Sequence, residues 1–283
     1  MADEFPGLTI ITVTRNRPDG LRRCLTRTRN VFPDVPIVVY DDASDLPAAV
    51  NSAVADLGMV RVLRGTSCLG PAGGRNICIE HANTPFCLSL DDDCYLNDVG
   101  GLQEWFYERP KYNNVGVVCF QVRRTHDNVL SPSNNRKSGE ILSFHGGASL
   151  LKRSVFQAVG GYRTLLRFGG EDTELARRIW LSGYQVWYDA SVQVQHEHNP
   201  LGRRKLLNSY YYIRNQLIIE ALTGHPFWGL PTGIVKALRK GIFDRRPLAT
   251  PVAIMMGVAL TLIHWRERTP LPVSVRKKLA TLA

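Results

Sequence analysis

The sequence lacks the signatures of several large protein classes. Its six cysteines are scattered and no two of them form a C-x-x-C pair, which argues against a disulfide framework or a zinc site and predicts reduced thiols. No segment repeats at a fixed spacing, and no tract has low complexity. The first residues, MADEFPGLTIITV, begin acidic and contain only a short apolar stretch, so we predict no signal peptide and a cytoplasmic protein.

Long apolar runs and acidic residues are also scarce. The apolar segment near the C-terminus, PVAIMMGVALTLIHW at 251–265, has 15 residues, whereas a membrane span needs about 20. The 35 basic residues outnumber the 25 acidic ones and give a formal net charge of +10. Such an excess indicates an anionic partner, which can be a nucleic acid, a nucleotide or an acidic membrane surface.

What the chain does contain is a regular alternation of strand-like and helical segments. With 283 residues, 44% of them apolar, it can form one large α/β domain, or one domain with a helical appendage. We predict a mostly parallel sheet with helices on both faces and ligands beyond the carboxyl ends of the strands. In the first third of the chain the expected strands lie at 8–14, 36–45, 60–65 and 85–93, and the expected helices at 17–30, 45–58 and 70–83.

Carboxylates gather where these strands end. The triplet Asp91, Asp92 and Asp93 directly follows the apolar run PFCLSL, and Asp41 and Asp42 end the second strand. A solvated turn would explain one acidic triplet, but carboxylates crowded on one rim destabilise one another unless a cation or donor groups offset them. Mg²⁺ and Mn²⁺ prefer carboxylate oxygens. The D-x-D step therefore predicts a divalent metal site.

The segment GTSCLGPAGGRNICIEHA at 65–82 is a second candidate for ligand contact. It matches neither a P-loop nor a dinucleotide fingerprint, and a tight turn alone would explain its glycines. However, Gly70, Gly73 and Gly74 permit close approach of a ligand to the backbone, and Arg75 adds a permanent positive charge. A ligand that carries a diphosphate would suit this segment.

A third candidate lies in FGGEDTELARRIWLSGY at 168–184. The spacing of Leu175, Ile179 and Trp180 predicts a helix that ends at Gly183 and has Glu171 and Asp172 in its first turn. The helix dipole favours carboxylates there by about 0.3–1 kcal/mol, which is an adequate structural explanation for the pair.

Two histidines follow the next strand-like run, YDASVQVQHEH. A single histidine is more often structural than a metal ligand. His196 and His198 nevertheless stand together at a strand end of a chain that already indicates a metal site, which favours a role in metal binding.

Taken together, seven segments resemble the family 2 glycosyltransferases of the GT-A fold, and the resemblance runs from about residue 8 to about residue 200. It implies an inverting, metal-dependent enzyme that moves a hexosyl or deoxyhexosyl group from a nucleoside-diphosphate sugar to an acceptor hydroxyl. The segments are TVTRNRP, VVYDDAS, GPAGGRN, LSLDDDC, FHGGASLLKRSVFQAVGGY, GGEDTELARRIWLSGY and VQVQHEH.

The resemblance also implies roles for single residues. Asp172 becomes the catalytic base, and Asp93, Asp91 and His196 hold Mn²⁺ or Mg²⁺, with His198 as the alternative histidine. Gly146, Gly147 and Glu171 lie on the acceptor side. The donor nucleotide sugar, expected to be a UDP- or dTDP-sugar, is contacted by Thr14, Arg17, Asp41, Gly70, Arg75, Asn76, Asp91 and Asp92, with Asp42 a less certain contact.

The resemblance and the composition together predict two parts. Residues 1–200 form the catalytic domain, with a nucleotide-sugar half at about 1–95 and an acceptor half at about 96–200. Residues 201–283 form a basic, helical extension, which either packs beneath the catalytic domain or lies on an anionic membrane surface at the inner face. The helix expected at 203–224 favours packing, and the basic flanks of 251–265 favour the membrane.

The acceptor can be a glycan, a lipid-linked glycan or a small molecule. Two rival functions stay open at this point. A sugar nucleotidyltransferase uses a carboxylate-held metal on a similar sheet, and it would release pyrophosphate instead of a nucleoside diphosphate. The positive charge alone would also suit a nucleic-acid-binding protein, but no recognition motif accompanies it, so we expect no nucleic acid partner.

Overall fold

A central β-sheet carries the fold. The computed structural model describes residues 5–107, 113–131, 136–197 and 205–282. In these ranges the sheet has ten strands, with the main order β3-β2-β1-β4-β9-β6-β10-β5, while β7 pairs with β6 and β8 pairs with β10. The strands are β1 (Leu8–Thr14), β2 (Ile37–Asp41), β3 (Val60–Arg64), β4 (Phe86–Leu90), β5 (Cys94–Leu96), β6 (Val115–Arg124), β7 (Leu130–Ser131), β8 (Gly139–Glu140), β9 (Ala148–Lys152) and β10 (Gln185–His196).

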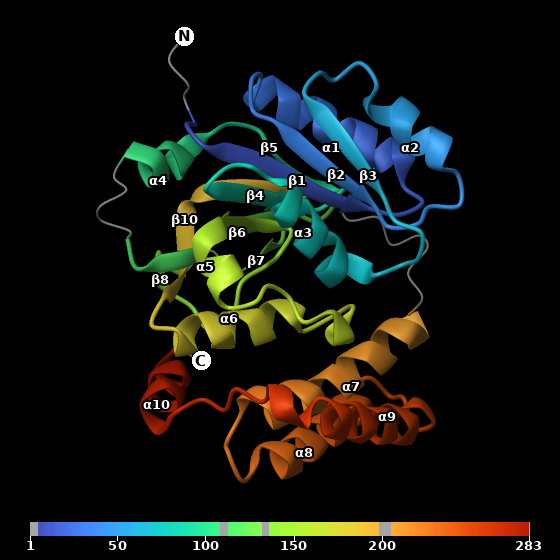
Figure 1. The fold of residues 1–283 in the computed structure, drawn as a ribbon, viewed down its shortest axis with the longest axis vertical. Helices are drawn as coiled ribbons and strands as arrows, with labels where there is room; N and C mark the ends of the chain where they lie inside the picture. The colour runs from blue at the N-terminus through green and yellow to red at the C-terminus, as the bar shows by residue number, and fades with distance from the viewer. Residues whose placement is uncertain (1–4, 108–112, 132–135, 198–204, 283) are drawn as a thin grey trace.

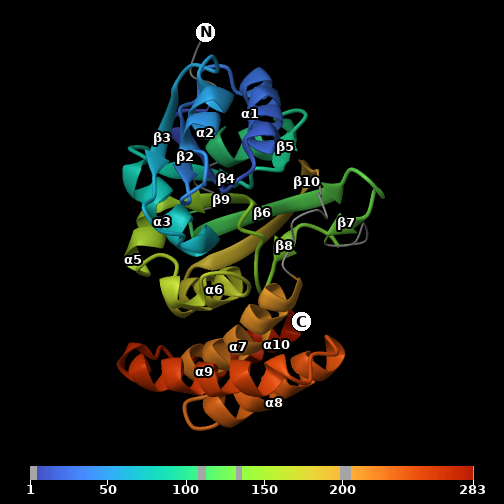
Figure 2. The same cartoon turned by 90° about the vertical axis from the view of Figure 1, so that its right-hand side faces the viewer.

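Helices cover both faces of the sheet, as the alternation of segments predicted (Figures 1 and 2). One hydrophobic core joins the sheet to α1, α2 and α4, and a second joins its other face to α3, α5, α6 and α10. Successive side chains of a strand point to opposite faces, so Ile10 of β1 lies in the first core and Ile11 in the second. The helices are α1 (Pro18–Val31), α2 (Pro47–Val54), α3 (Gly70–His81), α4 (Glu104–Tyr107), α5 (Arg153–Ala158), α6 (Glu171–Leu181) and α10 (Val273–Thr281).

The strand directions bring distant segments to one rim. β1, β2, β3 and β4 are parallel, and the register places Thr14 beside Asp41 and Asp41 beside Arg64 at their carboxyl ends. β9 is antiparallel to both β4 and β6, so it starts at this rim, with Ala148 opposite Leu90. β10 runs parallel to β6 and therefore ends at the same rim with His196.

The C-terminal part is a layer of helices beneath α6, as Figures 1 and 2 show. It comprises α7 (Lys205–Thr223), α8 (Gly229–Phe243) and α9 (Ala249–Ile263). One face of α7 packs on α8 and α9 through Ile213 and Leu217. Its other face packs through Ile218 and Leu222 against Leu166 of the catalytic part. The helix expected at 203–224 is present over Lys205–Thr223, with residues 203 and 204 outside the described ranges, and it packs beneath the sheet layers. No helix in the described ranges has both the length and the apolar character to cross a bilayer.

Candidate active site

The carboxylates of the acidic triplet bind two arginines: Asp91 contacts Arg75, whereas Asp92 and Asp93 share Arg17. Asp91 accepts a hydrogen bond from Arg75 Nη2 at 2.7 Å. Asp92 is buried and accepts from Thr14 Oγ1 at 2.8 Å and from Arg17 Nη1 at 2.6 Å. Asp93 accepts from the same Arg17 nitrogen at 3.0 Å. Three neighbours in sequence therefore tie together the end of β1, the start of α1 and the second turn of α3.

Asp93 and His196 form the group best suited to a divalent metal. The pairing of β5 with β10 sets Cys94 opposite His196, and His196 Nε2 lies 3.3 Å from Asp93 Oδ1. One ligand atom from each of Asp93, Cys94 and His196 lies within 4.8 Å of the others. Burial raises the pKa of the Cys94 thiol well above its usual value, and Mg²⁺ and Mn²⁺ prefer oxygen ligands. Cys94 is therefore a neighbour of this site and a poor ligand for it.

The environment separates the acidities of two adjacent carboxylates. Burial raises the pKa of Asp92 to about 7, although Arg17 opposes this shift. Burial also acts to raise the pKa of Asp93, but the contacts with His196 and Arg17 outweigh it and hold this pKa below its usual value. Asp93 is therefore the member of the pair that stays ionised at neutral pH, as a metal ligand must.

Arg75 is the buried centre of a second cluster. Its side chain is 5% exposed, and its Nη1 lies 3.7 Å from both Glu171 Oε1 and Asp172 Oδ1. Burial and the neighbouring Asp172 raise the pKa of Glu171 to about 7. The side chain of Asp172 is 22% exposed, against 7% for Glu171, although its Oδ1 atom is itself buried on the side of Arg75. Asp172 thus offers the better-exposed carboxylate of the pair to a substrate.

Two glycines before β9 allow these carboxylates to approach. The backbone N–H of Gly146 donates to Asp172 Oδ2 at 2.9 Å. A Cβ atom at Gly147 would lie 2.1 Å from Asp91 Cγ, and one at Gly146 would lie 2.4 Å from Asp172 Oδ1. Any side chain at either position would displace a carboxylate, so the HGG segment shapes the site directly.

The acidic end of β2 is neutralised by the protein itself. Asp41 accepts from Arg64 Nη1 at 2.5 Å and from the backbone N–H of Ser44 at 2.9 Å. Asp42 accepts from the backbone N–H groups of Leu69 and Gly70, at 2.6 and 3.0 Å. These carboxylates need no metal ion to offset them. Asp42 holds the start of α3, and Arg64 is a rim residue that the sequence patterns did not single out.

The structure gives Asn76 a structural contact. Its side-chain oxygen accepts from the backbone N–H of Tyr162 and its amide nitrogen donates to the Tyr162 carbonyl, both at 2.8 Å. Gly70 has a φ of +77°, and a Cβ there would lie 2.4 Å from the carbonyl oxygen of Arg167. The predicted donor contacts of Asn76 and Gly70 stay predictions. His198 lies outside the described residues, so His196 alone is placed.

The helix α7 supports the loop that precedes Asp172, which motif reading missed. The amide nitrogen of Asn215 lies 2.7–2.9 Å from the carbonyl oxygens of residues 166, 168 and 169. Arg214 Nη2 donates to the Leu165 carbonyl at 2.8 Å. The sequence signal is weak: a polar pair, Arg214 and Asn215, lies close to the apolar residues of RNQLII, and its partners are 46 to 49 residues away along the chain.

We expect Asn215→Ala to lower both stability and turnover. It leaves buried carbonyl groups unpaired, which costs about 1–3 kcal/mol in the free energy of unfolding, and it frees the loop that leads into Asp172. Thermal melts and kcat measured on Asn215→Ala and Gln216→Ala test this, because Gln216 is a half-buried neighbour on the same helix. Equal effects of the two substitutions would show that Asn215 has no special part in holding the loop.

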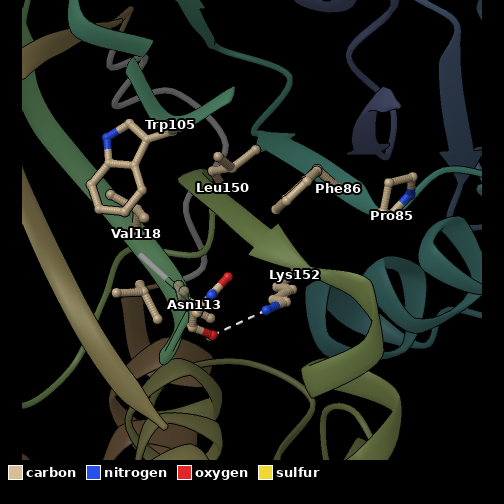
Figure 3. A pocket seen from close by; sticks show the side chains of 10 residues that line it. Pro85, Phe86, Trp105, Asn113, Val118, Leu150 and Lys152 are labelled. Atoms are coloured by element: carbon tan, nitrogen blue, oxygen red, sulfur yellow. Dashed lines mark hydrogen bonds between the residues drawn. The ribbon is translucent and has the colours of Figure 1, made fainter. Parts of the chain in front are cut away.

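A cavity elsewhere in the molecule does not belong to this site. Figure 3 shows it between the starts of β4 and β6, at the opposite end of the parallel strands from the carboxylate rim. Its described lining includes Phe86, Trp105, Val118 and Leu150, and its single charged residue, Lys152, donates to the Asn113 carbonyl. It therefore holds none of the groups that the chemistry of the rim requires.

The order of the sheet and the carboxylate rim define a protein of the GT-A fold. Solved structures with this fold include GalNAc-T7 with UDP, GalNAc and Mn²⁺ (TM-score 0.62, 17% identity, 77% of this chain and 48% of that one). The mannosyltransferase PcManGT from Pyrobaculum calidifontis with GDP-Man and Mn²⁺ aligns over 98% of this chain and 79% of its own, with a TM-score of 0.55 and 20% identity. The profile of Glycosyl transferase family 2 matches residues 9–210. The chain belongs to this family.

Similar curated proteins include two glycosyltransferases. The pre-mycofactocin glycosyltransferase of Mycobacterium tuberculosis is 24% identical over 221 residues, which are 72% of this chain and 46% of that protein. Human beta-1,4 N-acetylgalactosaminyltransferase 1 is 33% identical over 86 residues, which are 30% of this chain and 15% of that protein. The chain thus spans less than half the length of these relatives.

Proposed function

We propose that the chain is an inverting glycosyltransferase that moves a hexosyl or deoxyhexosyl group from a UDP- or dTDP-sugar to an acceptor hydroxyl. The observation that carries the proposal is the orientation and exposure of the Asp172 side chain. One carboxylate oxygen accepts from the Gly146 N–H at 2.9 Å, and the side chain is 22% exposed, against 7% for Glu171. A carboxylate held in this way is oriented and still able to accept a proton.

The residues near Asp93 fit a divalent cation. Asp93 and His196 supply an ionised oxygen and an imidazole nitrogen 3.3 Å apart, and PcManGT and GalNAc-T7, which share the fold, were solved with Mn²⁺. We propose that Asp93, Asp91 and His196 hold Mn²⁺ or Mg²⁺. Asp91 is bound to Arg75 here, so it would contribute one of its two oxygens. Such an ion neutralises the charge that develops on a departing diphosphate.

In this proposal the residues of the cluster around Arg75 carry out the sugar transfer. As the acceptor oxygen attacks the anomeric carbon, its proton passes to the Asp172 carboxylate. The new C–O bond forms on the face opposite the leaving group, the bond between the sugar and the diphosphate breaks with its electron pair, and the anomeric configuration inverts. Arg75 holds Asp91 and Asp172 in place and keeps a positive charge beside the departing phosphate. General-base assistance of this kind contributes about 10²–10⁴-fold.

We assign the nucleotide to the rim formed by β1, β2 and the start of α3. Thr14, Arg17, Asp41, Gly70, Arg75 and Asn76 are the proposed contacts, with Asp92 acting through Thr14 and Arg17. Gly146, Gly147 and Glu171 lie on the proposed acceptor side. The proposed acceptor is a glycan, lipid-linked glycan or small molecule at the cytoplasmic side of the membrane, and no nucleic acid takes part.

Ligand binding and product analysis test the proposal. In the presence of Mn²⁺, one or more UDP- or dTDP-sugars should raise the melting temperature, because a ligand that binds only the folded state stabilises it. Turnover with an acceptor should release a nucleoside diphosphate. Release of pyrophosphate would identify a nucleotidyltransferase instead, and a failure of every nucleotide sugar to stabilise the protein would contradict the donor assignment.

A further inference from the structure

The fully buried residues of helices α8 and α9 are small, and most of their large apolar residues are exposed; Leu230, Ile234, Ile254 and Val258 are partly buried against α7 and its neighbours. In α8 the buried residues recur every four positions, at Gly229, Gly233, Ala237 and Gly241. In α9 the buried residues are Thr250, Ala253, Gly257 and Thr261. The exposed large apolar residues of this part include Val235, Leu238, Ile242, Phe243, Leu248, Val252, Met255, Met256, Leu262, Ile263 and Trp265.

Close backbone packing fixes this orientation. A Cβ at Gly233 would lie 2.6 Å from the carbonyl oxygen of Leu217 in α7, and one at Gly241 would lie 2.0 Å from Thr250 Oγ1 in α9. Neither helix can rotate to bury its large residues, because a larger side chain would then meet these atoms. The outward apolar surface is therefore imposed by how the three helices pack.

The exposure is extensive at both ends of the pair of helices. Phe243 is 82% exposed and Leu248 is 88% exposed in the turn between α8 and α9. At the other end Phe227 is 84% and Trp228 is 65% exposed. Surface helices in water normally bury their large apolar residues, whereas helices that pack through small residues with large ones outward are typical of a lipid environment. Apolar exposure on this scale marks an interaction surface.

The charge of this surface and the length of α9 indicate what covers the exposed apolar residues. Among the described residues of α8, α9 and the segments beside them, Arg239, Arg245 and Arg266 have no acidic partner. The acidic residues there are already paired, Asp244 with Lys240 and Glu267 with His264. In a dimer formed through this surface, the unpaired arginines of one copy would lie near those of the other and repel them. Anionic lipid head groups would instead complement their charge. The 15 residues of α9 span about 22 Å, less than the roughly 30 Å of a bilayer core.

We infer that the outward face of α8 and α9, defined by the exposed apolar residues above and their arginines, lies in the plane of an anionic membrane surface. The helices lie along the surface with their apolar side chains among the acyl chains and their arginines at the head groups. The opposite face of α7 holds the loop before Asp172. The helix α7 therefore contacts both the proposed membrane-binding helices and the loop of the candidate active site. The inference does not depend on the transfer reaction.

Vesicle binding by the full chain tests the inference without any substrate. We expect cosedimentation with vesicles that contain about 30 mol % phosphatidylglycerol, much weaker binding to phosphatidylcholine alone, and loss of binding as salt screens the arginines. The triple variant Ile242→Ser, Phe243→Ser, Leu248→Ser should bind anionic vesicles at least about tenfold more weakly. Met59→Ser, which changes an exposed apolar residue before β3, should bind as the parent does.

Two further measurements keep the test decisive if the triple variant folds poorly. The variant Arg239→Gln, Arg245→Gln, Arg266→Gln changes only exposed residues and should lose the preference for anionic vesicles. Tryptophan emission should shift to the blue on vesicle binding, and Trp228→Phe with Trp265→Phe should remove that shift while binding persists. Absence of binding, equal binding to both vesicles, or a dimer in solution that the triple serine variant abolishes would overturn the inference.

Discussion

Asp172→Asn is expected to reduce kcat by about 10²-fold or more while donor affinity changes little. The Gly146 N–H donates to Asp172 Oδ2, so the asparagine oxygen takes that position and the amide group replaces Oδ1. The position of Oδ1, which lies 3.7 Å from Arg75 Nη1 in the parent, then carries N–H donors, and the side chain as a whole can no longer accept a proton. The side chain keeps its anchor and loses its basicity.

A purely structural role predicts a different result. If Asp172 only stabilised the first turn of α6, asparagine would forfeit a dipole term below about 1 kcal/mol and activity would persist. The measurements are kcat, donor affinity and a thermal melt to confirm folding. A folded variant that retains more than about a tenth of the parent rate would remove Asp172 from the role of base.

Glu171→Gln is the matched control. Glu171 shares the turn and the contact with Arg75, but its side chain is 7% exposed, against 22% for Asp172. Burial and Asp172 raise its pKa to about 7, so near neutral pH part of the parent population already carries a neutral side chain here. We expect Glu171→Gln to cost much less activity than Asp172→Asn.

Asp93→Asn is expected to abolish metal-dependent donor binding, and excess chelator should do the same to the parent. The substitution keeps the shape of the side chain but removes the ionised oxygen beside His196, and metal ligands must carry that charge. Thermal shift with UDP, titrated with Mn²⁺, measures the effect apart from turnover. Full activity in excess chelator would contradict the metal site.

Cys94→Ala is the control for this second prediction. The Cys94 sulfur belongs to the same compact group of atoms, but burial keeps it a thiol and hard cations prefer oxygen. The alanine variant should keep its response to Mn²⁺, apart from any loss of stability. A loss of that response equal to the loss in Asp93→Asn would make Cys94 a ligand.

Much of the fold could be predicted because its determinants are local. A short β-branched run such as residues 8–14 is too short for a helix, and it forms β1 with the predicted bounds. The spacing of Leu175, Ile179 and Trp180 placed α6, and all three residues are buried on one face. Parallel strands expose their carboxyl ends on one edge, so the rim that gathers Thr14, Asp41 and Asp91 also followed from strand order.

What each rim residue contacts was decided by pairing between segments far apart in the chain. The pairing of β4 with β9 brings Gly147 against Asp91, and the pairing of β5 with β10 brings His196 to Asp93. The sequence could not say that Asp92 turns inward to Thr14, because adjacent residues in a turn can face any direction.

The sequence by itself determined the alternating α/β fold, the carboxylate rim and the basic, apolar character of the C-terminal helices, because composition and periodicity encode these locally. The tertiary structure decided which of Glu171 and Asp172 is better exposed, that Asn215 holds the loop before Asp172, and which face of α8 and α9 points outward. The physical reason is the close approach of other parts of the chain to glycines: side chains at Gly146 and Gly241, and the backbone of α7 at Gly233. A glycine shows that such approach is allowed, and only the folded chain shows what approaches it.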